Sequence, residues 1–331
     1  QCAVCRWWRA CDTRRRTDDH LSFVAGISRM QTQELQHAGI NTLAQLGALP
    51  IPLPFKPRRG AAASYERVRE QARLQLAGRQ QKLPLHELLP VTLEHGLARL
   101  PAPSPGDIFL DLEGDPFARA GGREYLFGTA SIDSDGSCVY RGRWAFTDAE
   151  ERAAFEDVID TVLAAWSANP GMHVYHYAHY EPAAFKRLMG RHASREAEVD
   201  RMLRADVFVD LYAIVWHSVR ASVEGYSIKD LEPFYGFSRG VALVDARRNL
   251  RLVERALEVG AADVVSADVR DAVEGYNRDD CVSTLGLREW LERLRADVEV
   301  STASPVPRPR PTDGAVPEKL DDRARRVQAL V

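Results

Sequence analysis

Two carboxylates on one face of a predicted strand constrain the fold of this chain more than any other sequence feature. The strand covers residues 108–112 of the stretch IFLDLEGD, and its apolar run predicts that it is buried. Asp111 and Glu113 are two residues apart, so their side chains point to the same face of the strand. Neighbouring carboxylates repel each other unless a cation lies between them, and hard oxygen ligands suit Mg²⁺ or Mn²⁺. The alternative is a solvated strand end that binds nothing.

A second acidic motif lies near the other end of the chain, in the sequence YNRDD at residues 276–280. Apolar residues at helical spacing follow it and predict a helix. These residues are Val282, Leu285, Leu287, Trp290, Leu291 and Leu294. Tyr276 and Asp280 are four residues apart, so they share one face of that helix. An aromatic hydroxyl is therefore expected beside a carboxylate.

A third motif lies between the other two, in the sequence VYHYAHYEP at residues 174–182. It predicts a short strand, a turn rich in aromatic residues and the start of a helix. Glu181 falls in the first turn of that helix. The chain therefore presents acidic residues at a strand end, at a helix start and inside a late helix.

In this order, the three motifs resemble those of the DEDD exonucleases of the RNase H-like superfamily, which are also called DnaQ-like, in their tyrosine variant (DEDDy). The resemblance covers residues 105–298 and is in particular to the YprB-type domain of RecB-like nucleases that also carry a helicase. It depends on the phrases HYAHYEP, YSIKDLE and YNRDDC. The middle motif departs from the pattern, because most of these enzymes have Asp where this chain has Glu181. The fold implied is α/β and RNase H-like, with a central mixed sheet flanked by helices.

The resemblance also implies a two-metal-ion mechanism, with two Mg²⁺ or Mn²⁺ ions about 3.5–4 Å apart. Asp111 would bridge both ions, and Glu113 and Asp280 would complete the coordination of one. Glu181 would help to hold the other ion, directly or through water. Tyr276 would orient the attacking water, since a pKa near 10 makes tyrosine a poor general base at neutral pH.

Further elements are predicted between the motifs. Two runs flank the turn DSDG and predict a β-hairpin, and a helix is predicted to follow a cap at Asp148. Asp210 stands in the sequence VDLY at another predicted helix start. An aspartate recurs at this place in the resembled family, which implies a supporting role for Asp210 behind the metal ligands. As an N-cap, however, it needs no catalytic role.

Three cysteines crowd the N-terminus with the spacing Cys2-x2-Cys5-x5-Cys11. Such spacing can bind zinc or an iron–sulfur cluster. Residues 1–16 resemble the C-terminal cysteine triplet of iron–sulfur nucleases of the AddB type, which implies a 4Fe–4S cluster that stabilises the fold in the full-length protein. A zinc site completed by His20 and three free cysteines are the alternatives.

The remaining ranges are separated by composition. Residues 17–60 predict a helical hairpin-like segment with a Pro-rich connector, and residues 61–104 predict a helical linker. Residues 299–331 are a Pro-rich stretch, expected to be an extended linker toward a missing C-terminal region. The resemblance makes that region a helicase of the same polypeptide, a partner of this domain.

Composition restricts the class of protein but does not indicate a particular ligand. The 331 residues carry a formal net charge of −3, so no global basic field points to nucleic acid. No apolar run approaches the ~20 residues of a membrane helix, so no membrane partner is expected. The few cysteines do not form a secreted disulfide scaffold, which favours a cytoplasmic location.

The combined interpretation is a nuclease that cleaves single strands in the 3′→5′ direction, with DNA ahead of RNA as the substrate. Aromatic side chains near Glu181 could stack on unpaired bases or pack in the core. They are Tyr175, Tyr177, Tyr180, His176 and His179. Two alternatives stay open. One is a catalytically weak nucleic-acid-binding module for the helicase or nuclease, and the other is a metal-stapled scaffold.

Overall fold

The computed structural model describes residues 5–316, which cluster into two compact units. The predicted range 105–298 contributes to both, because an internal segment of it clusters with the N-terminal residues. The first unit comprises the described residues up to Pro90 together with Trp216–Gly236, and the second comprises Val91–Val215 and the described residues from Phe237 onward.

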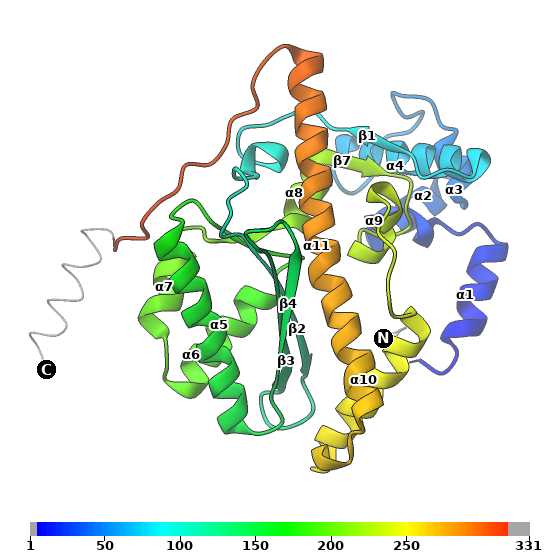
Figure 1. Cartoon of the computed structure of the whole chain (residues 1–331). Helices are drawn as coiled ribbons and strands as arrows, with labels where there is room; N and C mark the ends of the chain where they lie inside the picture. Colours follow the sequence, from blue (N-terminus) through cyan, green and yellow to red (C-terminus); the bar gives the residue numbers. More distant parts are fainter. Residues whose placement is uncertain (1–4, 317–331) are drawn as a thin grey trace, which may run out of the picture. The chain divides into compact units, whose positions relative to one another are not determined.

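A five-stranded mixed sheet forms the centre of the second unit (Figure 1). The strand order is β4-β3-β2-β5-β6. The pairs β2–β3 and β3–β4 are antiparallel, whereas β2–β5 and β5–β6 are parallel. The strands are β2 (Ile108–Asp115), β3 (Arg123–Ile132), β4 (Cys138–Trp144), β5 (Val174–His176) and β6 (Phe208–Asp210). The predicted mixed α/β fold and the predicted hairpin at its edge are confirmed.

Helices cover both faces of this sheet (Figure 1). α5 contacts β3 and β4, and α6 contacts β2, while α7 packs on α5 and α6. On the other face, α11 contacts four of the strands, and α10 packs on α11. The helices are α5 (Asp148–Ala168), α6 (Tyr180–His192), α7 (Glu196–Arg204), α8 (Leu211–Ser218), α10 (Leu243–Glu258) and α11 (Ala267–Thr302).

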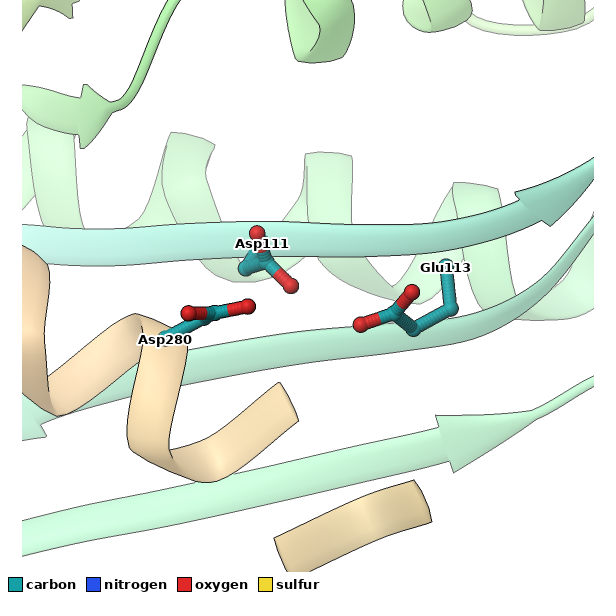
Figure 2. A group of neighbouring side chains, drawn as sticks. All are labelled: Asp111, Glu113 and Asp280. Atoms are coloured by element: carbon teal, nitrogen blue, oxygen red, sulfur yellow. The ribbon is translucent and has the colours of Figure 1, made fainter. Parts of the chain in front are cut away.

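Alternation along β2 assigns its side chains to the two faces of the sheet. Asp111 and Glu113 lie on the face toward α11, from which Asp280 approaches them (Figure 2). Leu110 and Leu112 belong to the core on the opposite face. One strand therefore supplies apolar contacts to α5 and α6 and carboxylates to the space under α11.

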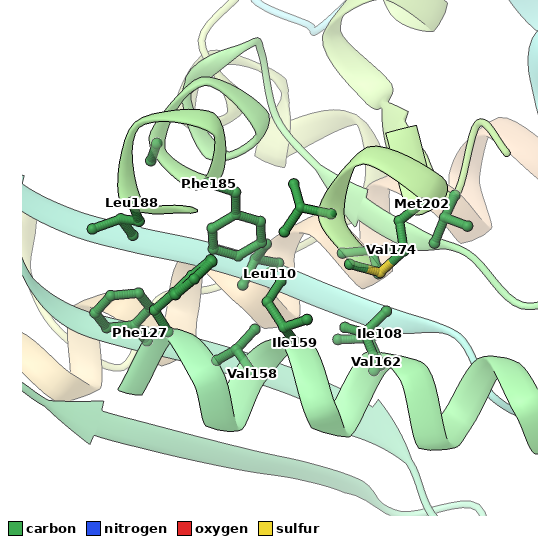
Figure 3. Close-up of a cluster of buried hydrophobic side chains, with 14 of the residues drawn as sticks. Ile108, Leu110, Phe127, Val158, Ile159, Val162, Val174, Phe185, Leu188 and Met202 are labelled. Carbon is green, nitrogen blue, oxygen red and sulfur yellow. The ribbon is translucent and has the colours of Figure 1, made fainter. Parts of the chain in front are cut away.

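The largest hydrophobic core fills the space between the sheet and the helices α5, α6 and α7 (Figure 3). Phe155 of α5 and Phe185 of α6 are fully buried there, with ring centroids 5.8 Å apart. Leu110, Phe127 and Val174 contribute from three neighbouring strands. This core stabilises the sheet through the face that packs on α5, α6 and α7, so the opposite face can carry polar side chains.

Helix α5 begins with a different cap from the one predicted at Asp148. Thr147 is the N-cap: its hydroxyl accepts from the backbone N–H of Glu150, and the Glu150 carboxylate accepts from the Thr147 N–H at 2.9 Å. Asp148 is instead the first helical residue and forms ion pairs with Arg119 and Arg123. The Thr-x-x-Glu capping box satisfies two backbone donors, whereas an Asp cap alone satisfies one.

The residues after α11 pack on the second unit, although the prediction was an extended linker that buries no apolar surface. Helix α11 runs on to Thr302, and residues 305–316 have neither helix nor strand. Val306 is nevertheless buried, and the Arg295 side chain donates to its carbonyl. Arg308 pairs with Glu292 of α11 at 2.6 Å.

The first unit contains short helices and a two-stranded antiparallel sheet. Capping boxes at Ser28 and Thr42 start two short helices, as the sequence predicted for this stretch. Their core includes Leu35, Leu43 and Tyr65. The elements are α1 (Trp8–Thr17), α2 (Arg29–His37), α3 (Leu43–Gly47), α4 (Ala62–Gln81), β1 (His86–Leu88), β7 (Val219–Ala221) and α9 (Ile228–Tyr235). No helix among residues 5–316 is long and apolar enough to cross a membrane.

Two phenylalanines test the core assignment with one chemical change. Phe155→Ala is expected to lower the free energy of unfolding by about 3–5 kcal/mol, because it opens a cavity in the packed core. Phe117→Ala is the matched control, since Phe117 is 78 % exposed, and it should change stability by less than about 0.5 kcal/mol. Urea unfolding followed by circular dichroism measures both. Equal losses in the two variants would contradict the assignment.

Candidate metal centre

Three carboxylates converge where β2 faces α11 (Figure 2). One oxygen each from Asp111, Glu113 and Asp280 lies within 4.8 Å of the other two. Among the described residues this is the only group of three or more such side chains with the spacing of metal ligands. The strand end and the helix face that were expected to converge do so.

The end of β2 is irregular at the point where the acidic residues emerge. Asp111 lies opposite Gly128 of β3, and the register shifts between Glu113 and Gly114. Such a bulge bends a strand and redirects its side chains. A Cβ atom at Gly114 would lie 2.1 Å from Oε2 of Glu124 and 2.5 Å from the Tyr180 hydroxyl, so the glycine permits this close packing.

Asn277 connects the two elements that carry the acidic residues, and the sequence reasoning missed it. Its side-chain amide donates to Oδ2 of Asp111 at 2.7 Å and to the Asp111 carbonyl at 3.2 Å. Its Oδ1 accepts from the Tyr140 hydroxyl at 2.8 Å. Burial raises the pKa of Tyr140, so this hydroxyl stays protonated and fixes which end of the amide faces Asp111. Asn277 is fully buried, so it holds one carboxylate oxygen in a fixed orientation.

Gly128 leaves the room that Asn277 occupies. A Cβ at Gly128 would lie 1.6 Å from Oδ1 of Asn277, so any other residue there would displace the Asn277 side chain from its place. A glycine inside a strand indicates a close approach by another group. That signal was present in the sequence, although the approaching residue could not be named from it.

The neighbouring residues Asp279 and Asp280 have different contacts. Oδ1 of Asp280 accepts from the guanidinium of Arg239 at 2.6 Å, and both side chains are at least nine-tenths buried. Oδ2 of Asp279 accepts from the backbone N–H of Val241 at 3.0 Å. Asp279 therefore anchors the segment that carries Arg239, and Arg239 meets the acidic group.

Glu181 is buried in the first turn of α6, where the sequence placed it. No hydrogen-bond donor among the described residues reaches its Oε2, which lies 3.4 Å from Nδ1 of His176. That nitrogen lies 2.5 Å from the Ala178 carbonyl, to which it donates when protonated. Glu181 does not belong to the group of three, but it offers a buried oxygen with unused acceptor capacity.

Four carboxylates act on the buried thiol of Cys281, which follows Asp280 in α11. Burial raises the pKa of Cys281 well above its usual range, and the charges of four acidic residues raise it further. These residues are Asp111, Asp280, Glu181 and Glu113. So much negative charge around one buried position is costly without a cation, and the oxygen donors suit a hard divalent ion.

Tyr276 and Asp210 occupy the places that the sequence indicated. Tyr276 is half-buried one turn before Asp280, and the Arg239 guanidinium lies 5.4 Å from its ring centroid. Oδ1 of Asp210 accepts backbone N–H groups of Tyr212 and Ala178, both at 2.9 Å. Asp210 thus caps α8 and ties down the turn before Glu181 without joining the group of three.

The aromatic residues near Glu181 were expected to stack on bases or to pack in the core, and two of them pack in the core. Tyr175 is fully buried and stacks on Phe109 at 5.3 Å, and the His176 ring is 2 % exposed. His179 and Tyr180 are exposed; Tyr180 has 41 % of its surface accessible, and its hydroxyl donates to Oε2 of Glu124 at 2.8 Å. The difference follows from the elements, because all three residues of β5 are buried, whereas Tyr180 is the first residue of α6.

The cysteine motif is only partly visible. Cys2 lies outside the described residues, while Cys5 and Cys11 are exposed free thiols. Nδ1 of His20, the residue weighed as a zinc ligand, accepts from the backbone N–H of Ser22 at 3.0 Å. A cluster or zinc ion at these cysteines stays a prediction.

Comparisons with known proteins agree with this geometry. A protein-family model described as RNase_H superfamily matches residues 108–292, which are more than half of the 331 residues. The matched range contains the three converging carboxylates, Asn277 and Glu181. No curated protein and no solved structure matches the chain.

Binding of Mn²⁺ tests the acidic group directly. Asp111→Asn is expected to weaken Mn²⁺ binding by at least about ten-fold, because even residues that only support a ligand change affinity by roughly 10–100-fold. The control is Asp297→Asn, which makes the same change at an exposed position of the same helix as Asp280. Electron paramagnetic resonance of free Mn²⁺ gives both affinities. Equal affinities in the two variants would show that Asp111 is not a ligand.

Proposed function

Because the chain belongs to the RNase H superfamily, we propose that it is a metal-dependent nuclease that hydrolyses phosphodiester bonds, as a 3′→5′ exonuclease on single strands. The observation that carries this proposal is the group of carboxylate oxygens within 4.8 Å of one another. They come from β2 and α11, at the two ends of the matched range. Fold alone would not support an activity, whereas a buried acidic group on that fold does.

The donor set supports the binding of divalent cations. Asp111, Glu113 and Asp280 would hold one ion between β2 and α11. Glu181 would help to hold a second ion through Oε2, the buried oxygen that accepts no hydrogen bond from the described residues. When bound, Mg²⁺ or Mn²⁺ would supply the Lewis-acid chemistry of phosphodiester hydrolysis.

The protein's own groups would orient the reactants. Asn277 donates to Oδ2 of Asp111 and would hold that carboxylate in a fixed orientation toward the ion. Tyr276 would position the attacking water with its hydroxyl, as a hydrogen-bonding group and not as a base. Asp210 would support the site indirectly, because it fixes the turn from which Glu181 starts.

The wider context is part of the proposal. The motifs support a YprB-type domain of a larger nuclease–helicase protein, with DNA as its substrate and with a 4Fe–4S cluster or zinc at Cys2, Cys5 and Cys11. No G-x-x-x-x-G-K-[ST] sequence occurs in the 331 residues. The helicase would therefore lie outside them, and these residues alone should not hydrolyse ATP.

A catalytically weak nucleic-acid-binding module is the second candidate. Two observations favour it: Glu181 stands where most DEDD enzymes have Asp, and Arg239 already contacts Asp280. Such a module would bind single strands without cleaving them. The cleavage experiment below separates the two candidates.

Cleavage of single strands labelled at the 3′ or the 5′ end, with Mg²⁺, Mn²⁺ or EDTA, tests the proposed reaction. Asp111→Asn and Asp280→Asn should each lower the rate by at least ~10²-fold, since each removes a ligand charge, while Asp297→Asn should not. Tyr276→Phe should slow turnover by roughly 10–10³-fold with unchanged Mn²⁺ affinity, because only water positioning is lost. Wild-type rates in both Asp variants would contradict the assignment of Asp111 and Asp280 as metal ligands. Loss of Mn²⁺ binding in Tyr276→Phe would make that residue structural.

The exposed ring of Tyr180 gives a test of the preferred form of substrate. If this ring stacks on an unpaired base, single strands should be cut at least ~10-fold faster than blunt duplexes, because stacking contributes ~1–3 kcal/mol per base. Tyr180→Ala should remove much of that preference, whereas Tyr180→Phe keeps the ring and loses only the contact with Glu124. The measurement is the cleavage rate of each variant on single strands and on blunt duplexes. Equal loss in both variants would assign the effect to the hydroxyl.

A further inference from the structure

Arg239 brings a buried positive charge into the acidic group. Its guanidinium donates to Oδ1 of Asp280 at 2.6 Å, and its side chain is only 8 % exposed. The same guanidinium lies over the ring of Tyr276, with its central carbon 5.4 Å from the ring centroid. The cation thus contacts Tyr276 and Asp280, the two residues that define the Y-x-x-x-D motif on α11, and both contacts restrain its position.

The backbone that carries Arg239 is fixed as firmly as its side chain. Oδ2 of Asp279 accepts the N–H of Val241 at 3.0 Å, two residues beyond the arginine. Val241 also packs closely on α11, since a Cβ at Gly275 would lie 2.8 Å from its Cγ2 atom. Two successive aspartates of one helix therefore hold the segment and its cation, so Arg239 is oriented before any substrate binds.

The charge balance of the site favours a contact between Arg239 and an anionic substrate. The four carboxylates around Cys281 would balance two divalent ions, so the positive charge of Arg239 is in excess of a neutral centre. A phosphodiester carries one negative charge, and its charge grows as the nucleophile arrives. A guanidinium has five N–H donors in a planar fork, so one edge can hold a carboxylate while another meets a phosphate oxygen.

We propose that Arg239 is a further catalytic residue, which donates hydrogen bonds to a non-bridging oxygen of the scissile phosphate. This inference rests on the proposed nuclease function. In the hydrolysis, the oxygen of a water molecule bonds to phosphorus and the bond from phosphorus to the 3′ oxygen breaks. One water proton ends on the 3′ oxygen and the other stays with the phosphate product. Arg239 transfers no proton and stabilises the charge on the phosphate oxygens in the transition state.

The test compares Arg239→Gln and Arg239→Lys in the 331-residue chain, with Arg293→Gln, at an exposed position of α11, as the matched control. Arg239→Gln is expected to lower kcat by roughly 10²–10³-fold, the usual loss when one donor to a developing oxyanion is removed. Mn²⁺ affinity should be unchanged or tighter, because a cation beside Asp280 has been removed. Arg239→Lys should recover only part of kcat, since a point charge replaces the fork.

Sulfur substitution at the scissile phosphate distinguishes a direct contact of Arg239 with the substrate from a purely structural role of this residue. Replacing one non-bridging oxygen by sulfur gives two diastereomers of the substrate. The wild type should cleave more slowly the diastereomer whose sulfur stands at the position that Arg239 contacts. In Arg239→Gln this difference should shrink, because the contact is already lost.

The outcomes separate this inference from the proposed function. An active wild type with an equally active Arg239→Gln overturns only the role of Arg239. Loss of cleavage together with loss of Mn²⁺ binding in that variant also overturns it, because Arg239 would then act only on Asp280. A wild type that binds Mn²⁺ but cleaves no strand overturns both. Loss of kcat with intact Mn²⁺ binding and a reduced sulfur effect supports the proposal.

Discussion

The hydrogen bonds of Asn277 hold the two halves of the acidic group together. A helix and a strand that are 166 residues apart in the sequence meet through one amide, which donates to Asp111 and accepts from Tyr140. The contact is buried, so breaking it would leave polar groups without partners, at about 1–3 kcal/mol each. Gly128 makes the approach possible because it has no side chain where the amide lies. The separation between Asp111 and Asp280 therefore depends on a residue that is not itself a ligand.

The sequence predicted those parts of the fold that depend on local pattern. The apolar run of β2 and the helical spacing after Tyr276 predicted the strand and the helix, and the spacing of Asp111 and Glu113 predicted that they share one face. The predicted hairpin β3–β4 and the start of α6 at the middle motif also agree with the structure. Where two local signals competed, at Thr147 and Asp148, the capping box decided the start of α5. These features need only neighbouring residues, so a single sequence contains them.

The parts that sequence reasoning missed depend on contacts between distant segments. Nothing near Arg239 in the sequence indicates a contact with the acidic group, because its segment is anchored by Asp279, 38 residues beyond Val241. The sequence reasoning assigned a role to Asp280 alone, whereas Asp279 also has one, since it anchors the segment that carries Arg239. Alternation in the sequence could turn only one of Tyr175 and His176 inward, yet the three-residue strand β5, which lies between β2 and β6, buries both. Burial of a short strand on both faces is a tertiary property.

Glu181, where most of the exonucleases that the motifs resemble have Asp, is held by contacts of the turn that precedes it. The Glu181 side chain has one methylene more than Asp, so its carboxylate lies further from the helix backbone. The position of that carboxylate therefore depends on how firmly the preceding turn is held. Asp210 fixes that turn through the Ala178 N–H, and the Ala178 carbonyl lies at hydrogen-bond distance from Nδ1 of His176. His176 therefore stands beside Glu181 at 3.4 Å without satisfying its Oε2. A buried carboxylate oxygen kept near other carboxylates is unfavourable for stability alone, and a bound cation is the partner that would offset that cost.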